Sequence, residues 1–128
     1  MKIGFIGLGN VGGKLAGSLL RNGFDLTVRD LNQEIASPFL DNGAKWGESP
    51  KKIAETVELI ITCLPNPEAS ATVMEADDGV LAGISHGKVW AEMSTTDEEE
   101  VKRLGKMVHE LGGEALDCPV SGGCHRAA

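Results

Sequence analysis

The sequence has 128 residues, of which 41% are hydrophobic and 24% charged, and its formal net charge is −7. This length fits one domain with a sizeable core, and the composition is ordinary for a globular protein. The acidic balance leaves no basic stripe for a phosphate backbone and no apolar run reaches bilayer-spanning length, so neither nucleic acid nor a membrane is an expected partner.

The first predicted elements are an apolar strand at residues 2–6, a glycine-rich turn and an amphipathic helix at residues 10–21. The turn fits the G-x-G-x-x-G pattern in the strand, turn and helix context where that pattern indicates dinucleotide binding. Its residues are Gly7, Leu8, Gly9, Asn10, Val11 and Gly12. Gly7 suits the tight turn, Gly9 lets a pyrophosphate approach the backbone, and Gly12 lets the helix pack closely on the strand.

An acidic residue follows the second predicted strand, at residues 25–29. This residue, Asp30, lies eighteen positions after Gly12, close to the distance expected for a carboxylate that binds the adenosine ribose hydroxyls. Asp30 would also repel a 2′-phosphate, which favours NAD over NADP. A Walker-type phosphate loop is excluded because Leu8 and Leu15 stand where Gly and Ser or Thr are required. A glycine-rich turn without a ligand is the competing interpretation.

The remaining sequence alternates between helical and strand patterns. Ser37 and Pro38 predict a broken or late-starting helix that ends at Gly43. The later predicted elements are a strand at 44–46, helices at 50–56 and 68–74, a buried strand at 58–64, a loop or single turn at 79–87, a strand at 88–93, a helix at 97–111 and a strand at 114–117. Such alternation predicts an α/β Rossmann fold, with a doubly wound parallel sheet of order 3-2-1-4-5-6 and the ligand at the carboxyl ends of its first and fourth strands.

Cysteine and histidine usage gives no sign of a metal centre. Cys63, Cys118 and Cys124 are an odd number at unrelated spacings, and no signal peptide pattern precedes the first strand. We therefore expect reduced thiols and a cytoplasmic location. Cys118, Cys124 and His125 lie close together in sequence but do not have a zinc-binding spacing, so no metal is expected.

Four segments in order resemble the β-hydroxyacid dehydrogenases, a family that includes 3-hydroxyisobutyrate dehydrogenase, tartronate semialdehyde reductase and 6-phosphogluconate dehydrogenase. They are residues 4–12, residues 61–65 (ITCLP), residues 93–96 (MSTT) and residues 117–123 (DCPVSGG). The last segment is similar to the family's Asp-x-Pro-Val-Ser-Gly-Gly substrate signature and is the most specific of the four.

The resemblance implies a role for each matching position. The six residues of the glycine turn would line the pyrophosphate and Asp30 would bind the ribose, while Leu64 and Pro65 would flank the cofactor and Thr95 would contact it near the nicotinamide. Ser121, Gly122 and Gly123 would hold the substrate carboxylate. Structural alternatives stay open: Pro65 as a strand stop, Thr95 as a helix cap, and the Ser-Gly-Gly segment as a flexible exit from the sheet.

Several positions depart from the family pattern. Glu92 stands where the family usually has Asp, which we expect to matter little, and Arg29 stands where an aromatic residue is common. Residues 1–123 would form the dinucleotide-binding domain, and residues 124–128 would begin a truncated connection to the family's all-α second domain. The family's catalytic lysine, in a G-x-x-x-K-x-x-N motif, has no counterpart here. We therefore assign no catalytic residue and expect this chain alone to bind cofactor without turnover.

The resemblance as a whole implies the cofactor domain of an NAD-dependent oxidoreductase. The complete enzyme would transfer a hydride between the nicotinamide and a small β-hydroxy acid resembling 3-hydroxyisobutyrate. Its partners would be a small carboxylate substrate and further copies of itself in a homo-oligomer. Two alternatives remain: a non-catalytic, dinucleotide-sensing regulatory domain such as those of potassium channels, and an enzyme resembling pyrroline-5-carboxylate reductase.

Overall fold

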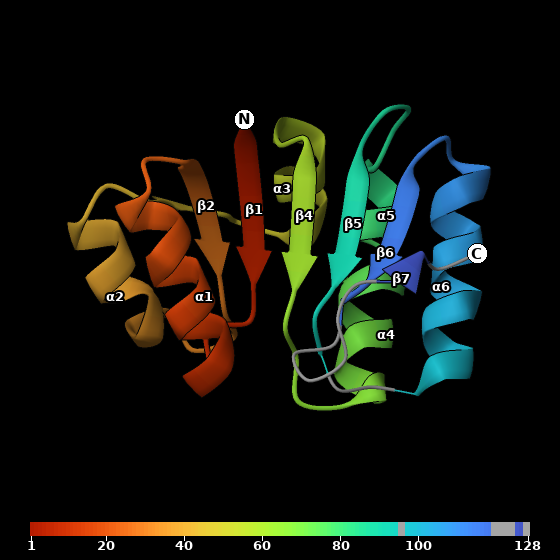
Figure 1. Cartoon of the computed structure of the whole chain (residues 1–128), viewed down its shortest axis with the longest axis horizontal. Coiled ribbons are helices and arrows are strands. Elements are labelled where there is room, and N and C mark those ends of the chain that lie inside the picture. Colours follow the sequence, from red (N-terminus) through yellow and green to blue (C-terminus); the bar gives the residue numbers. More distant parts are fainter. Residues whose placement is uncertain (95–96, 119–124, 127–128) are drawn as a thin grey trace.

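The computed structural model describes residues 1–94 and 97–118, and the backbone of residues 125–126. Its strands form one sheet of order β3-β2-β1-β4-β5-β6-β7 (Figure 1). They are β1 (Lys2–Ile6), β2 (Asp25–Arg29), β3 (Lys45–Trp46), β4 (Leu59–Thr62), β5 (Val89–Glu92), β6 (Glu114–Asp117) and β7 (His125–Arg126). The first six run parallel in the predicted 3-2-1-4-5-6 order, so the predicted Rossmann fold is confirmed.

Strand β7 was not predicted from the sequence. The backbone of His125 and Arg126, in the segment expected to begin the connection to a second domain, pairs antiparallel with β6. Its two residues are too few to show a hydrophobic period of their own. It extends the β6 edge of the sheet.

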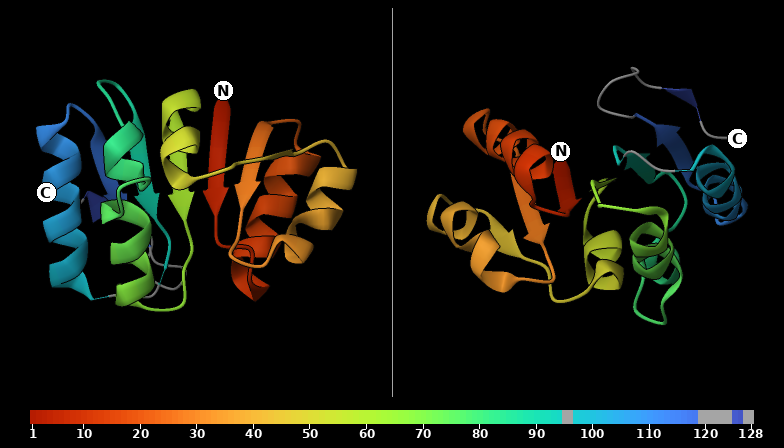
Figure 2. Two further views of the ribbon diagram at one scale, coloured as in Figure 1. Left: turned by 180° about the vertical axis from the view of Figure 1, so that it is seen from behind. Right: turned by 90° about the horizontal axis from the view of Figure 1, so that it is seen from below.

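Helices cover both faces of the sheet, as the figures show (Figures 1 and 2). They are α1 (Asn10–Arg21), α2 (Gln33–Asp41), α3 (Pro50–Thr56), α4 (Pro67–Glu75), α5 (Val80–Gly83) and α6 (Glu98–Glu110). Phe5, Leu26 and Val28 pack on the α1 and α2 side, whereas Ile60 and Trp90 pack on the side of the other four helices. Since both faces are covered, the central strands are apolar almost throughout.

The predicted break in α2 is wrong. The helix runs without interruption from Gln33 to Asp41 with Pro38 inside it. The Asn32 side chain accepts a hydrogen bond from the Glu34 N–H (3.1 Å) and starts the helix early. Pro38 removes one helical hydrogen bond, but it lies on the exposed face, where water can hydrate the unpaired carbonyl. Burial of Ala36 against the sheet favours the helix despite this loss.

Side-chain caps also set where α3 and α4 begin. Ser49 Oγ accepts from the Lys52 N–H (3.1 Å) ahead of Pro50, as its sequence predicted. Asn66 Oδ1 accepts from the Ala69 N–H (2.8 Å), so α4 starts at Pro67 rather than Glu68. The Asn66 cap places the start of α4 next to the loop that leaves β4.

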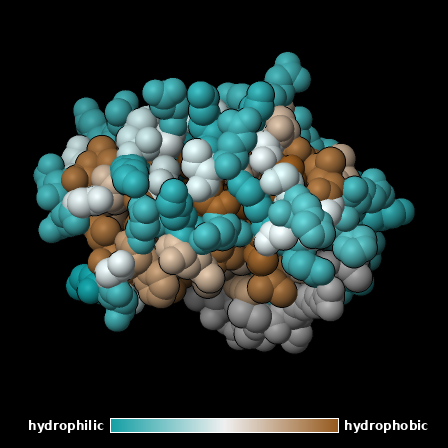
Figure 3. Space-filling model, turned by 90° about the horizontal axis from the view of Figure 1, so that it is seen from above, coloured by the Kyte–Doolittle hydropathy of each residue, from teal (hydrophilic) through white to brown (hydrophobic). Residues whose placement is uncertain are grey.

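The face at the amino ends of the strands carries mainly hydrophilic side chains, with apolar ones in separate small groups (Figure 3). Within the described ranges, no helix has the length and apolar character needed to cross a membrane.

Candidate dinucleotide site

A cavity of about 950 Å³ opens at the carboxyl ends of β1, β2 and β4. Strand β1 lies between the other two, so the cavity sits where the strand order reverses, the usual ligand crevice of a doubly wound sheet. Its lining includes the predicted residues Gly7, Gly9, Asn10, Val11, Gly12, Asp30, Leu64 and Pro65. Of the other predicted residues, Leu8 is buried in the core beneath the turn, and Thr95, Ser121, Gly122 and Gly123 lie outside the described residues.

Two of the three motif glycines have structural roles. Gly7 has a φ of +102°, and a Cβ there would lie 2.2 Å from the Cys63 carbonyl oxygen. A Cβ on Gly12 would lie 2.2 Å from the Gly7 carbonyl oxygen. Both clashes are with backbone atoms, so neither position accepts a side chain without moving β1, α1 or the loop after β4.

Gly9 differs from these two glycines. It is the N-cap of α1, its φ of −65° is available to any residue, and a Cβ there would meet no atom within 4 Å. The fold therefore does not require glycine at this position. It does leave open space in front of the first turn of α1, where N–H groups and the helix dipole favour an anion.

Asp30 is fixed beside the glycine turn by two backbone N–H groups. Its Oδ2 accepts from Leu8 N (2.8 Å) and its Oδ1 accepts from Asn32 N (3.0 Å). Each carboxylate oxygen has a further lone pair, so the group can still accept from a ligand hydroxyl. Asp30 thus ties the turn to the end of β2 and at the same time faces the cavity.

Arg29 is held on the β3 side of the cavity. Its Nη1 donates to the carbonyl oxygens of Gly47 (2.8 Å) and Glu48 (2.7 Å), and its guanidinium lies 5.5 Å from the centre of the Trp46 ring. These partners are backbone carbonyls and an aromatic face from a distant segment, which no local sequence pattern reveals. These contacts engage Nη1, while the Arg29 side chain also lines the cavity.

The loop after β4 forms the opposite wall of the cavity. The Leu64 N–H donates to Ser94 Oγ (2.5 Å), which joins this loop to the end of β5. Cys63 also lines the cavity. Burial, and then the negative charge of Glu92, raise the pKa of its thiol, so the thiol stays protonated near neutral pH and is a weak nucleophile.

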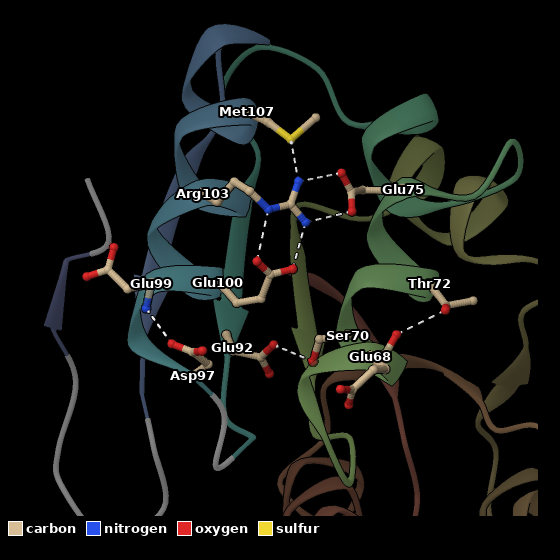
Figure 4. Close-up of polar contacts among 10 residues, drawn as sticks. All are labelled: Glu68, Ser70, Thr72, Glu75, Glu92, Asp97, Glu99, Glu100, Arg103 and Met107. Carbon is tan, nitrogen blue, oxygen red and sulfur yellow. Dashed lines mark hydrogen bonds and ion pairs between the residues drawn. The ribbon is translucent and has the colours of Figure 1, made fainter.

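Glu92, at the end of β5, lies behind this wall. It is fully buried, and its Oε1 accepts from Thr62 Oγ1 and from Ser94 N (both 3.0 Å). Its Oε2 accepts from Ser70 Oγ of α4 (2.9 Å; Figure 4). Trp90 Nε1 donates to Thr62 Oγ1 (2.9 Å). Because an indole N–H can only donate, Thr62 directs its own proton to Glu92.

A surface ion-pair cluster joins α4 to α6, further from the site (Figure 4). Arg103 of α6 makes a bidentate contact with Glu75 of α4 (2.6 and 2.7 Å) and another with Glu100 (2.7 and 2.9 Å). These hydrogen bonds lower the pKa of both carboxyl groups and raise that of Arg103. In the part of the chain that the structure describes, no three His, Cys, Asp or Glu side chains are placed to hold a metal ion.

The doubly wound sheet, the glycine turn at the start of α1 and the carboxylate at the end of β2 together define a dinucleotide-binding Rossmann domain. The sequence matches the family described as the NAD binding domain of 6-phosphogluconate dehydrogenase over residues 2–128, and the chain belongs to that family.

Known relatives include both an enzyme and a nuclear factor. The chain is 36% identical over 121 residues to mitochondrial 3-hydroxyisobutyrate dehydrogenase of Rattus norvegicus, covering 94% of this chain and 36% of that protein. It is also 36% identical over 121 residues to the cytokine-like nuclear factor N-PAC of Homo sapiens, covering 94% of this chain and 22% of that protein. The chain thus spans about a third or less of the length of these relatives.

A solved structure described as Psf3 in complex with NADP+ and 2-OPP superimposes with a TM-score of 0.88 at 29% identity. The superposition covers 94% of this chain and 43% of that one. Since that relative binds NADP+ and the matching family is named for NAD, these likenesses support an NAD(P)-binding domain without selecting between the two cofactors.

Proposed function

We propose that this chain is the cofactor-binding part of an NAD-dependent oxidoreductase acting on a small β-hydroxy acid such as 3-hydroxyisobutyrate. The observation that carries the proposal is the open space at Gly9, between the N-terminus of α1 and the carboxylate of Asp30. The fold does not need glycine at position 9, so the open space there suits a pyrophosphate. Asp30 lines the same cavity, where it suits the adenosine ribose that follows the pyrophosphate.

In this proposal the chain's own residues bind and orient the cofactor. The N–H groups of the first turn of α1 would face the pyrophosphate, and Asp30 would accept from the ribose hydroxyls. Leu31 and Ile35 expose apolar surface beside Asp30 at the cavity, which suits the adenine ring. Leu64 and Pro65 would flank the cofactor on its other side. Bound there, the nicotinamide would supply the hydride-accepting centre of the reaction.

The substrate half of the reaction is assigned by resemblance. Ser121, Gly122 and Gly123 would hold the substrate carboxylate, and Thr95 would lie near the nicotinamide. No lysine of residues 1–128 stands in the family's G-x-x-x-K-x-x-N motif, so we expect this chain alone to bind cofactor without turnover. Residues 1–123 would form the cofactor domain of a cytoplasmic, homo-oligomeric enzyme that binds neither nucleic acid nor membranes.

NAD is the proposed cofactor. Asp30 would repel a 2′-phosphate, and the nearest cation, Arg29, already donates to two carbonyl oxygens on the β3 side. Calorimetric titration of the chain with NADH and NADPH tests this choice: NADH should bind at least tenfold more tightly, as a charge-assisted hydrogen bond contributes roughly 1.5–3 kcal/mol. Equal or tighter binding of NADPH would contradict it.

A non-catalytic dinucleotide-binding module is the second candidate. The observation in its favour is the 36% identity to N-PAC, whose name describes a nuclear factor and not an enzyme. Assaying the complete natural protein with 3-hydroxyisobutyrate and NAD+ separates the two by the absorbance of the reduced nicotinamide. Turnover that is lost in a Gly9→Ala variant supports the enzyme, whereas NADH binding without turnover on any small β-hydroxy acid supports the module.

A further inference from the structure

Two polar side chains in series support the loop after β4, which carries Leu64 and Pro65 on the cavity wall. Ser94 Oγ accepts from the Leu64 N–H (2.5 Å), and the Ser94 N–H in turn donates to Glu92 Oε1 (3.0 Å). Ser94 is only 2% exposed and Glu92 is fully buried, so the acceptors of both hydrogen bonds lie away from bulk water. The position of the Leu64 amide therefore depends, through Ser94, on the carboxylate of Glu92.

The same carboxylate contacts both elements that flank the loop. Thr62, the last residue of β4, donates to Oε1. Ser70 of α4 donates to Oε2, as Figure 4 shows. Thr62 is itself oriented by the Trp90 indole N–H. One buried group thus joins the strand before the loop, the helix after it and the neighbouring strand β5. No ion pair within residues 1–94 and 97–118 involves Glu92, and its partners there are hydrogen-bond donors.

We propose that Glu92 is a positioning residue that holds the loop after β4 in the shape required by the nicotinamide half of the dinucleotide; this rests on the proposed function. A doubly wound sheet binds the two halves of a dinucleotide over its two sets of strands. Gly9 and Asp30 serve the half over β1 and β2. Glu92 lies beneath the loop that would contact the half over β4 and β5. Because Glu92 is fully buried, the cofactor would not contact it directly.

Two ligands separate this role from a general effect on folding. ADP carries the adenosine and pyrophosphate but no nicotinamide half, whereas NADH carries both. In Glu92→Ala, NADH affinity should fall roughly tenfold, because the loss of the three buried hydrogen bonds to the carboxylate lets the loop move. ADP affinity should stay within twofold of the wild-type value. Both are measured by calorimetry on the 128-residue chain, with NADH fluorescence as a second readout.

Conservative variants sharpen the test. Glu92→Gln keeps an oxygen for Thr62 and Ser94, and its amide can donate to the Ser70 hydroxyl, so NADH affinity should return to near wild type. Ser94→Ala removes the acceptor of the Leu64 N–H alone and should reproduce the selective loss of NADH affinity. Ser94→Ala also provides the test of the positioning role if Glu92→Ala does not fold.

The outcomes distinguish this inference from the function on which it rests. Unchanged NADH affinity in Glu92→Ala or in folded Ser94→Ala would overturn the positioning role and leave the proposed function standing. An equal loss of ADP and NADH binding in both variants would also overturn it, since that pattern marks a purely structural role. Failure of the wild-type chain to bind either ligand would overturn the proposed function and this inference together.

Discussion

The two walls of the cavity are built by different means. The wall on the β1 and β2 side depends on backbone geometry. Gly7 and Gly12 have no side chain, so α1 and the loop after β4 can pack closely on β1, and Asp30 is fixed by main-chain N–H groups. On the β4 and β5 side, a buried side-chain network around Glu92 holds the loop. The first wall depends on glycines and the second on buried hydrogen bonds, so substitutions should affect them differently.

Removing a structural glycine should have the largest effect. In Gly12→Ala the new Cβ would lie 2.2 Å from the Gly7 carbonyl oxygen, an atom that cannot turn away. We expect the free energy of unfolding to fall by about 2–3 kcal/mol, a typical cost of overpacking, with NADH binding lost as well. Urea denaturation measures the first and calorimetry the second. Gly9→Ala, in the same turn but with an open Cβ direction, is the matched control and should keep wild-type stability.

Asp30→Asn tests the charge on the first wall. The side chain keeps an oxygen that can accept from Leu8 N, so the turn should stay folded. NADH affinity should fall about tenfold because a charge-assisted hydrogen bond becomes a neutral one, and the preference for NADH over NADPH should shrink. Titrating both cofactors against both proteins measures the two effects. An unchanged preference would show that Asp30 does not face the ribose.

Thr62→Val tests the second wall by stability. The substitution keeps the shape but leaves the Trp90 indole N–H without its acceptor and removes one donor from Glu92. Unfolding free energy should fall by about 1–3 kcal/mol, the cost of an unsatisfied buried polar group. Thr56→Val, on the exposed end of α3, removes a hydroxyl bonded only to helix carbonyls and is the control. Equal stabilities of the two variants would show that the network contributes nothing.

The two walls also differed in how well the sequence predicted them. The glycine turn and Asp30 lie at fixed spacings along one βαβ unit, so a local sequence pattern predicted them. The alternation of strand and helix patterns predicted the doubly wound sheet and its strand order. The partners of Glu92 come from β4, β5 and α4, which only tertiary packing brings together. The same is true of the carbonyls that hold Arg29. In α2, burial of Ala36 outweighed the helix-breaking tendency of Pro38, and the short β7 carried no period to detect.

The Arg103 cluster should have the smallest effect, confined to neutral pH and low salt. Arg103 lowers the pKa of Glu75 and Glu100 below the usual value of 4.5. A lowered carboxyl pKa stabilises the fold above the unfolded-state pKa, and that contribution is lost as pH falls through the folded-state value. Arg103→Ala should therefore lower Tm slightly at pH 7 and not at pH 3, as these exposed pairs are screened by water. Lys106→Ala, on the same helix, is the control. An equal Tm difference at both pH values would contradict the assignment.

The most direct test of the dinucleotide site is the NADH affinity of Gly9→Ala beside that of the wild-type chain. The structure gives the alanine methyl group open space and an ordinary backbone conformation, so the variant should fold with wild-type stability. If the pyrophosphate lies against this turn, the methyl group would occupy its place. NADH binding should then weaken by a factor of ten or more, which corresponds to about 1.4 kcal/mol or more of binding free energy. A folded Gly9→Ala variant that binds NADH as tightly as the wild type would contradict the account.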